Sequence, residues 1–224
     1  MSTPNELIIR IKEDGNISVE EYIDGVKSYK AITPNSLLDC INQSLLRDGV
    51  SSGMLPKGCL SFTAHDNGGR YIVILHPEDR ADINYVGTVY KGFPLPRLVF
   101  GFHISSEGRV SQSRLGVVGN ANNLKPTTPM FKYPFSNVNG SHLCIGNNTL
   151  PKVQSLHTLG SLPYHILSMD NNNDHFSPSH NKLSLQMRDL FELLKDKHQS
   201  YYYEHILVPS GATLGDFITQ MGQS

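Results

Sequence analysis

The order of β-rich runs and helical patterns restricts the fold of this chain more than any other feature of its sequence. Short apolar or β-branched runs alternate with polar and glycine-containing breaks, which is typical of antiparallel strands. These runs cover residues 59–62, 71–75, 83–91, 98–104 and 110–118. Because helical patterns dominate after residue 150, the order predicts an α+β fold with a meander of about four strands, not a doubly wound parallel sheet.

Residues 6–32 predict a second, smaller antiparallel meander. Its three β-rich runs are separated by Asp14-Gly15 and Asp24-Gly25, and Asp-Gly between such runs is a strong hairpin signal. A break rich in Gly, Ser and Pro comes later, before the larger meander. We therefore expect two domains, an N-terminal meander plus helix at residues 1–50 and a main domain at residues 55–224.

A helix should follow the small meander. Thr33 is a suitable cap, Pro34 suits the first helical position and Gly49 is a stop signal. The apolar face of this helix consists of Leu37, Leu38, Ile41 and Leu45. Since that face should be buried, we expect Cys40 to be a small packing residue in or near the core.

The C-terminal part predicts helices joined by polar segments. Leucines at helical spacing indicate an interrupted helix within residues 150–169 and a second helix at residues 183–194, whose apolar stripe should face the core. The loop at residues 170–181 separates them. Residues 201–208 are expected to be extended, and residues 213–221 a last short helix.

Charge and cysteine usage narrow the class of protein. The 224 residues carry a formal net charge of -1, so the chain lacks the basic field that would hold nucleic acid or an anionic membrane. It has no apolar run of roughly 18 residues and no secretory signal pattern. Cys40, Cys59 and Cys144 are too widely spaced for a disulfide framework or a structural zinc site, which predicts a cytoplasmic protein.

Familiar cofactor motifs are missing from the sequence. There is no phosphate-binding Gly-x-x-x-x-Gly-Lys-Ser/Thr, no strand-linked Gly-x-Gly-x-x-Gly and no His-Glu-x-x-His. Asp174, His175 and His180 lie close together, but two histidines without a further placed ligand are weak evidence for a metal. We expect neither a cofactor nor a metal ion.

Residues 133–148 contain the best candidate for chemistry, the thiol of Cys144. Asn137, Asn139 and Gly140 favour a turn before it, and a cysteine at the edge of such a loop can be accessible. His142 precedes Cys144 by two residues, so on a strand both would lie on one face. By the residues alone, a nucleophile, a protease-like Cys/His pair and a buried structural thiol all stay open.

The segment from Pro134 to Cys144, with Asn137, Asn139 and Gly140 inside it, resembles the His-Pro-Asn…Asn-Gly…Cys segment of ubiquitin-conjugating enzymes. Over roughly residues 55–205 the chain is similar to the bacterial ubiquitin-conjugating-like family D, which includes protein B of the PRTRC system. The matching pieces are Pro94-Leu-Pro96-Arg-Leu98-Val99-Phe100, Thr128-Pro129-Met130-Phe131 and Tyr133 to Gly146. The resemblance implies a ubiquitin-conjugating-enzyme-like fold, a β-meander followed by the active-site loop and helices, with an N-terminal extension.

The resemblance also implies roles for individual residues. Cys144 would carry a ubiquitin-like protein as a thioester, and Asn137 would match the asparagine that holds the transition-state oxyanion. Phe135-Ser136 replaces the family's His-Pro, so a turn role for Asn137, bonding its own backbone, is equally open. His142 and His175 complete the candidate catalytic set, although His142 has no counterpart in the family and is by default an exposed histidine on a strand. His180 is a further possible helper from the same loop as His175.

The implied partners are a ubiquitin-like protein, a ThiF-like adenylating enzyme that consumes the ATP, and a JAB-type metallopeptidase. The acceptor would be an amine, and the family setting suggests antiviral defence. An alternative function is a non-catalytic relative of the same fold that binds or scaffolds the modifier and the activating enzyme. A third alternative is a Cys/His hydrolase that needs no partner.

Overall fold

The computed structural model describes residues 6–23, 26–45, 52–65 and 67–221. The chain divides into two compact units, residues 1–51 and 52–224. Most strands pair antiparallel and the helices are few, so the predicted α+β class is confirmed at that level.

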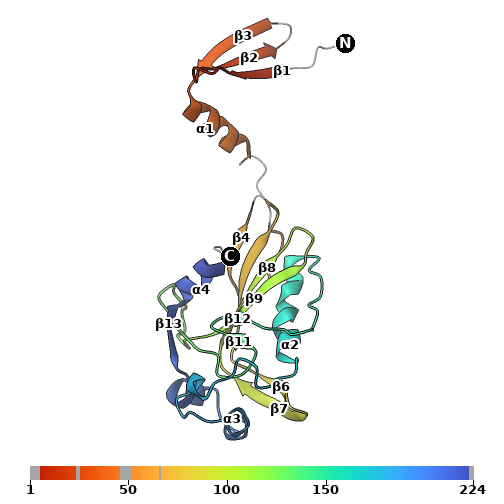
Figure 1. Ribbon diagram of the computed structural model, residues 1–224, viewed down its shortest axis with the longest axis vertical. Coiled ribbons are helices and arrows are strands. Elements are labelled where there is room, and N and C mark those ends of the chain that lie inside the picture. The colour runs from red at the N-terminus through yellow and green to blue at the C-terminus, as the bar shows by residue number, and fades with distance from the viewer. Residues whose placement is uncertain (1–5, 24–25, 46–51, 66, 222–224) are drawn as a thin grey trace. The chain divides into compact units, whose positions relative to one another are not determined.

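The first unit is a three-stranded antiparallel sheet followed by one helix (Figure 1). The elements are β1 (Glu6–Ile11), β2 (Ile17–Ile23), β3 (Val26–Ile32) and α1 (Pro34–Leu45). Gly15 has a φ of 80° in the β1–β2 turn, a conformation that glycine adopts without strain. Thr33 caps α1, because its Oγ1 accepts a hydrogen bond from the Ser36 amide at 3.1 Å. Both features confirm the predictions, whereas Asp24-Gly25 and Gly49 lie outside the described residues.

The expected apolar face of α1 is not buried. Leu38 is 57% exposed, Ile41 is 44% exposed and Cys40 is exposed as well. The prediction that Cys40 packs in a core is therefore wrong. A unit of this size has little interior to offer, since small domains bury a smaller share of their surface.

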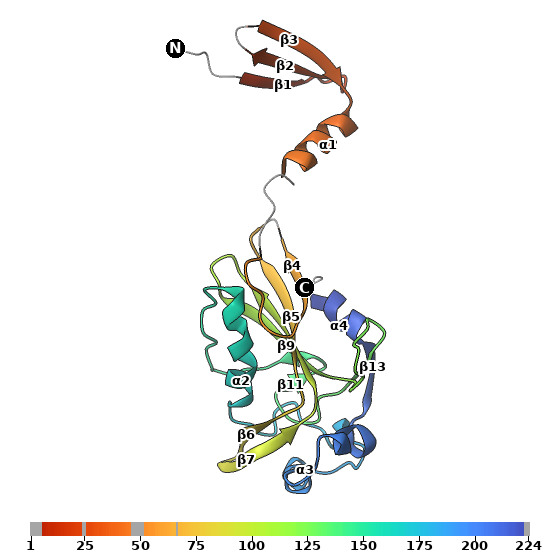
Figure 2. The same cartoon turned by 180° about the vertical axis from the view of Figure 1, so that it is seen from behind.

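The second unit is built around a large antiparallel sheet (Figures 1 and 2). Its strands lie in the order β11-β12-β9-β8-β5-β4, and β10 pairs with both β9 and β13. The long members are β4 (Cys59–Ala64), β5 (Arg70–His76), β8 (Leu98–Ile104) and β9 (Val110–Val118). The short members are β10 (Pro129–Phe131), β11 (Val138–Asn139), β12 (His142–Leu143) and β13 (Pro209–Thr213).

The expected strand at residues 83–91 is not a member of this sheet. Strands β6 (Asp79–Tyr85) and β7 (Thr88–Leu95) form a separate two-stranded hairpin, which is inserted in the sequence between β5 and β8. Val86 and Gly87 make its turn with φ values of 47° and 74°. The meander is therefore β4-β5-β8-β9, and the hairpin leaves it.

Helices cover both faces of the large sheet (Figure 2). On one face α2 (Leu162–Leu167) packs in the main core, and on the other face α4 (Leu214–Met221) packs against β5, β8 and β9. The helix α3 (Met187–Leu194) contributes to the main core from beside the β6–β7 hairpin. A 3₁₀ turn (Leu156–Ser161) precedes α2, and another (Pro178–His180) lies before α3. The predicted short helix at the C-terminal end and the buried stripe of α3 are confirmed.

Two predictions for the C-terminal part are wrong. Leu183 lies before α3 and is 45% exposed, so the helix begins later than its apolar pattern suggested. Residues 202–206 form a π-helical turn instead of an extended segment. Tyr202 is fully buried there and its hydroxyl donates to the Pro94 carbonyl at 2.8 Å, so tertiary packing outweighs the β-propensity of the tyrosines.

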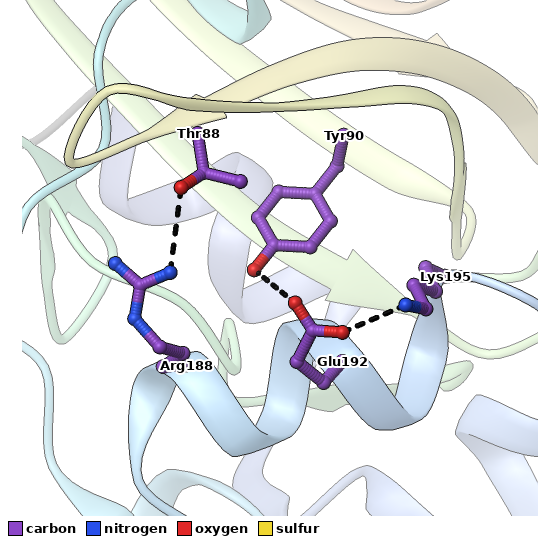
Figure 3. Close-up of polar contacts among 5 residues, drawn as sticks. All are labelled: Thr88, Tyr90, Arg188, Glu192 and Lys195. Carbon is purple, nitrogen blue, oxygen red and sulfur yellow. Dashed lines mark hydrogen bonds and ion pairs between the residues drawn. The ribbon is translucent and has the colours of Figure 1, made fainter.

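Polar contacts fasten α3 to the inserted hairpin (Figure 3). The Tyr90 hydroxyl donates to Glu192 Oε1 at 2.8 Å, and Lys195 Nζ donates to Glu192 Oε2 at 2.7 Å. Arg188 reaches Thr88 Oγ1 at 3.4 Å. Burial, and then the Glu192 carboxylate, raise the pKa of Tyr90, so the phenol stays a donor at neutral pH.

Candidate functional site

Phe135 and Ser136 begin the candidate site, and both are buried in the core. Phe135 is 2% exposed, and its ring stacks on Phe191 with a centroid distance of 4.9 Å. Ser136 is 1% exposed, and its hydroxyl donates to Asn171 Oδ1 at 3.1 Å. The two residues that precede Asn137 are thus both buried and both contacted by later segments of the chain.

Asn137 adopts a left-handed backbone conformation with a φ of 66°. Asparagine tolerates this region better than most residues. Its amide nitrogen donates to the Asp174 carbonyl at 2.8 Å, and its side-chain Nδ2 donates to the Asp170 carbonyl at 3.3 Å. Asn137 is therefore a turn residue as predicted, but its side chain bonds the loop at residues 170–174, not its own backbone.

A tight hairpin carries the chain from Asn137 to Cys144. Strands β11 and β12 pair Val138 with Leu143, and Gly140 turns between them with a φ of 63°. The Cys144 amide then donates to the Asn137 carbonyl at 2.8 Å, which closes the turn. Cys144 is a free and exposed cysteine, so the thiol lies at the surface beside Asn137.

The histidines lie around this turn without contacting the thiol. His142 is exposed on β12, opposite Arg114 of β9, and Cys144 follows after the strand has ended. His175 is exposed, with a left-handed φ of 58°, directly after the Asp174 carbonyl that binds Asn137. No hydrogen bond in the described ranges joins either imidazole to Cys144. His180 lies half-buried in a different cavity.

Sequence reasoning missed the contacts of the 170–174 loop, because it considered Asp174 only as a metal ligand with His175 and His180. Asp170 and Asp174 offer backbone carbonyls to Asn137, and Asn171 accepts from Ser136. The run of asparagines and aspartates at 170–174 is a turn signal, and turns of this kind expose carbonyl groups. That signal indicates a loop but does not identify what the loop contacts.

An open groove begins beside the cysteine. It has a volume of about 850 Å³ and is lined by Ile145, Asn148, Arg109, Lys152 and His165, among others. A much smaller cavity of about 20 Å³ lies behind Asn137, between Ser136 and Asn171, too small for a ligand. Cys144 itself is not among the residues that line either space.

The arrangement can support nucleophilic chemistry at an exposed thiol. Within the described ranges, no cluster of three or more His, Cys, Asp or Glu side chains could hold a metal ion. Across those same ranges, every helix is too short or too polar to cross a bilayer. Comparisons of the chain with protein-family models, with curated proteins and with solved structures gave no match.

Proposed function

We propose that residues 52–224 form a ubiquitin-conjugating-like transferase that carries a ubiquitin-like protein as a thioester on Cys144. The observation that carries this proposal is the closed turn in which the Cys144 amide bonds the Asn137 carbonyl at 2.8 Å while Cys144 is exposed. A carrier thiol must be reached by two large partners in turn, so exposure is required. An asparagine amide beside it can serve a developing oxyanion.

The order of the elements supports the same function. The meander β4-β5-β8-β9 precedes the cysteine segment, and α2, α3 and α4 follow it. The ubiquitin-conjugating-enzyme-like fold that the resemblance implies has this order. The groove that begins at Ile145, with a volume of about 850 Å³, is the proposed binding place for the C-terminal tail of a modifier.

The proposed reaction has two steps. The thiolate of Cys144 attacks the acyl-adenylate at the C-terminus of the modifier, AMP leaves, and a thioester forms. A primary amine of the acceptor then attacks the thioester carbonyl, the thiolate leaves, and an amide bond results after loss of a proton from nitrogen. The ThiF-like adenylating enzyme supplies the adenylate from ATP, so the carrier itself needs no cofactor.

The test is incubation of the full chain with an adenylating enzyme, ATP and the modifier. A covalent adduct that reducing thiols cleave should form on the natural protein, and Cys144→Ser should give either no adduct or an ester that resists thiols. Cys40→Ser is the matched control, because Cys40 is also an exposed cysteine. This variant should form the same amount of adduct as the natural protein. The proposal is refuted if the natural protein forms no adduct with an adenylating enzyme that has been shown to be active.

A binding role without catalysis is the second candidate function. One observation favours it: the Nδ2 of Asn137 already donates to the Asp170 carbonyl, so it is not directed at an oxyanion in this conformation. A scaffold of this kind would bind the modifier or the activating enzyme, with a JAB-type metallopeptidase as a further partner. Cys144→Ala would then leave modifier binding and cellular function intact, including any function in antiviral defence.

A further inference from the structure

A second cavity shares no lining residue with the groove at Ile145. It has a volume of about 500 Å³ and is bounded by β9, β10, β13, α4 and the tip of the hairpin. This volume is within the range of small-molecule sites. Cys144 does not line it, so the cavity is separate from the proposed carrier thiol.

In the part of the chain that the structure describes, the charged side chains that line this cavity are basic. Its lining includes Arg114, Lys132, His142 and His180, and among the residues that the structure describes no Asp or Glu lines it. Cations gathered in a partly desolvated space repel one another, and an anion placed among them relieves that repulsion. The lining therefore favours a ligand that carries negative charge.

One of the basic side chains is held in place by hydrogen bonds, and another has a shielded nitrogen without a partner. Arg114 is 7% exposed, and its Nη1 donates to Ser141 Oγ and to Gln220 Oε1, each at 3.1 Å. His180 is half-buried, and its Nδ1 is shielded from solvent without a hydrogen-bond partner. Burial, and then the charge of Lys132, lower the pKa of His180. An acceptor atom from a ligand would supply the partner that this nitrogen lacks.

The rest of the cavity is apolar. Leu115, Met130 and Phe217 contribute to its wall. Gly116 makes room for the Met130 methyl group, since a Cβ at that position would lie 2.7 Å from Met130 Cε. A wall of this composition suits a ligand with a hydrophobic body as well as a charged head.

We propose that this cavity binds a small organic anion, whose carboxylate or phosphate head pairs with Arg114, Lys132 and His180 while its apolar body contacts Met130 and Phe217. Charge-assisted hydrogen bonds from the guanidinium and the ammonium, with a hydrogen bond from the neutral imidazole, recognise both kinds of oxyanion head. The proposal is independent of the carrier function, because it needs neither Cys144 nor a protein partner.

The test is a titration of the full chain, labelled with ¹³C at its methionine methyl groups, with phenyl phosphate and with benzoate. The Met130 signal should move saturably at millimolar or lower concentration of at least one anion, while the signal of Met54, which is 73% exposed outside the cavity, stays fixed. Comparing the two anions shows whether a phosphate or a carboxylate is preferred. Benzyl alcohol, the neutral probe, should not saturate.

Variants that each remove one polar contact give the second measurement. Lys132→Gln removes a charge and His180→Phe removes a hydrogen-bond donor, and each should weaken binding of the better anion by about tenfold, the cost of one such contact. Lys57→Gln removes the same charge from an exposed position elsewhere and should leave the affinity unchanged. The proposal is overturned if Met130 does not respond to either anion, if benzyl alcohol binds equally well, or if all three variants bind like the natural protein.

Discussion

Replacing Asn137 by Ala and by Gly should reverse the usual order of stability of these two residues. At an ordinary position Ala is more stable than Gly by about 0.5–1 kcal/mol, because Gly loses more backbone freedom on folding. Asn137 has a φ of 66°, where a side chain with a Cβ is strained by about 1–2 kcal/mol and Gly is not. The conformational term at this position therefore favours Gly.

The hydrogen-bond loss is the same in both variants and cancels in their comparison. Each loses the donation from Nδ2 to the Asp170 carbonyl, which at 3.3 Å should cost about 0.5–1 kcal/mol. The backbone strain of Ala at this φ exceeds the conformational-entropy cost of Gly. Asn137→Gly should therefore be more stable than Asn137→Ala by roughly 0.5–1 kcal/mol. In a unit of this size that difference is about 1–4 °C in melting temperature.

Urea unfolding followed by far-UV circular dichroism measures both free energies of unfolding. Asn139 supplies the matched control, because it lies two residues away, is exposed and is not among the residues with positive φ. There Ala should equal or exceed Gly in stability. If Asn137→Ala proves as stable as Asn137→Gly, the left-handed turn at Asn137 does not constrain the folded state and the reasoning fails.

Two further predictions concern the core and the thiols. Phe135→Ala should lower the free energy of unfolding by about 3–5 kcal/mol, because Phe135 is 2% exposed and stacks on Phe191. Val89→Ala, at a site 55% exposed, is its control in the same urea titration, and a loss below about 1 kcal/mol for Phe135→Ala would contradict the packing. Burial raises the pKa of Cys59, so at neutral pH iodoacetamide should label Cys59 more slowly than Cys144, and its labelling should increase as pH rises towards that raised pKa. Peptide mapping by mass spectrometry measures both rates, and equal rates at neutral pH would show that Cys59 is not protected.

Local signals were sufficient for much of the fold. Alternating apolar runs located β8 and β9, Asp14-Gly15 located the first hairpin, and Thr33 located the start of α1. Each of these signals acts within a few residues, through turn conformation, capping or side-chain alternation. Such features form in the same way whatever the remainder of the chain does.

The inserted hairpin depends on contacts that sequence patterns do not show. Its turn is Val86-Gly87, which lacks the Asn-Gly or Asp-Gly signature, and Pro94 lies within β7, where proline argues against a strand. Proline is tolerated because β7 pairs with β6 alone, and its other edge has no ladder to interrupt. The Pro94 carbonyl instead accepts from the Tyr202 hydroxyl, a contact between residues far apart in sequence.

Whether Asn137 can serve Cys144 is a question of competing hydrogen bonds. The departure from His-Pro-Asn does not displace the turn, because Phe135 is anchored in the core and Ser136 bonds Asn171. The donation from Asn137 to the Asp170 carbonyl is long and half-exposed, so releasing it should cost no more than about 1 kcal/mol. An oxyanion donor is worth about 2.7–4 kcal/mol in the transition state. If Cys144 has the proposed carrier function, the exchange favours catalysis once the tetrahedral intermediate forms, and Asn137→Gly, which keeps the turn and removes the side-chain amide, isolates that contribution.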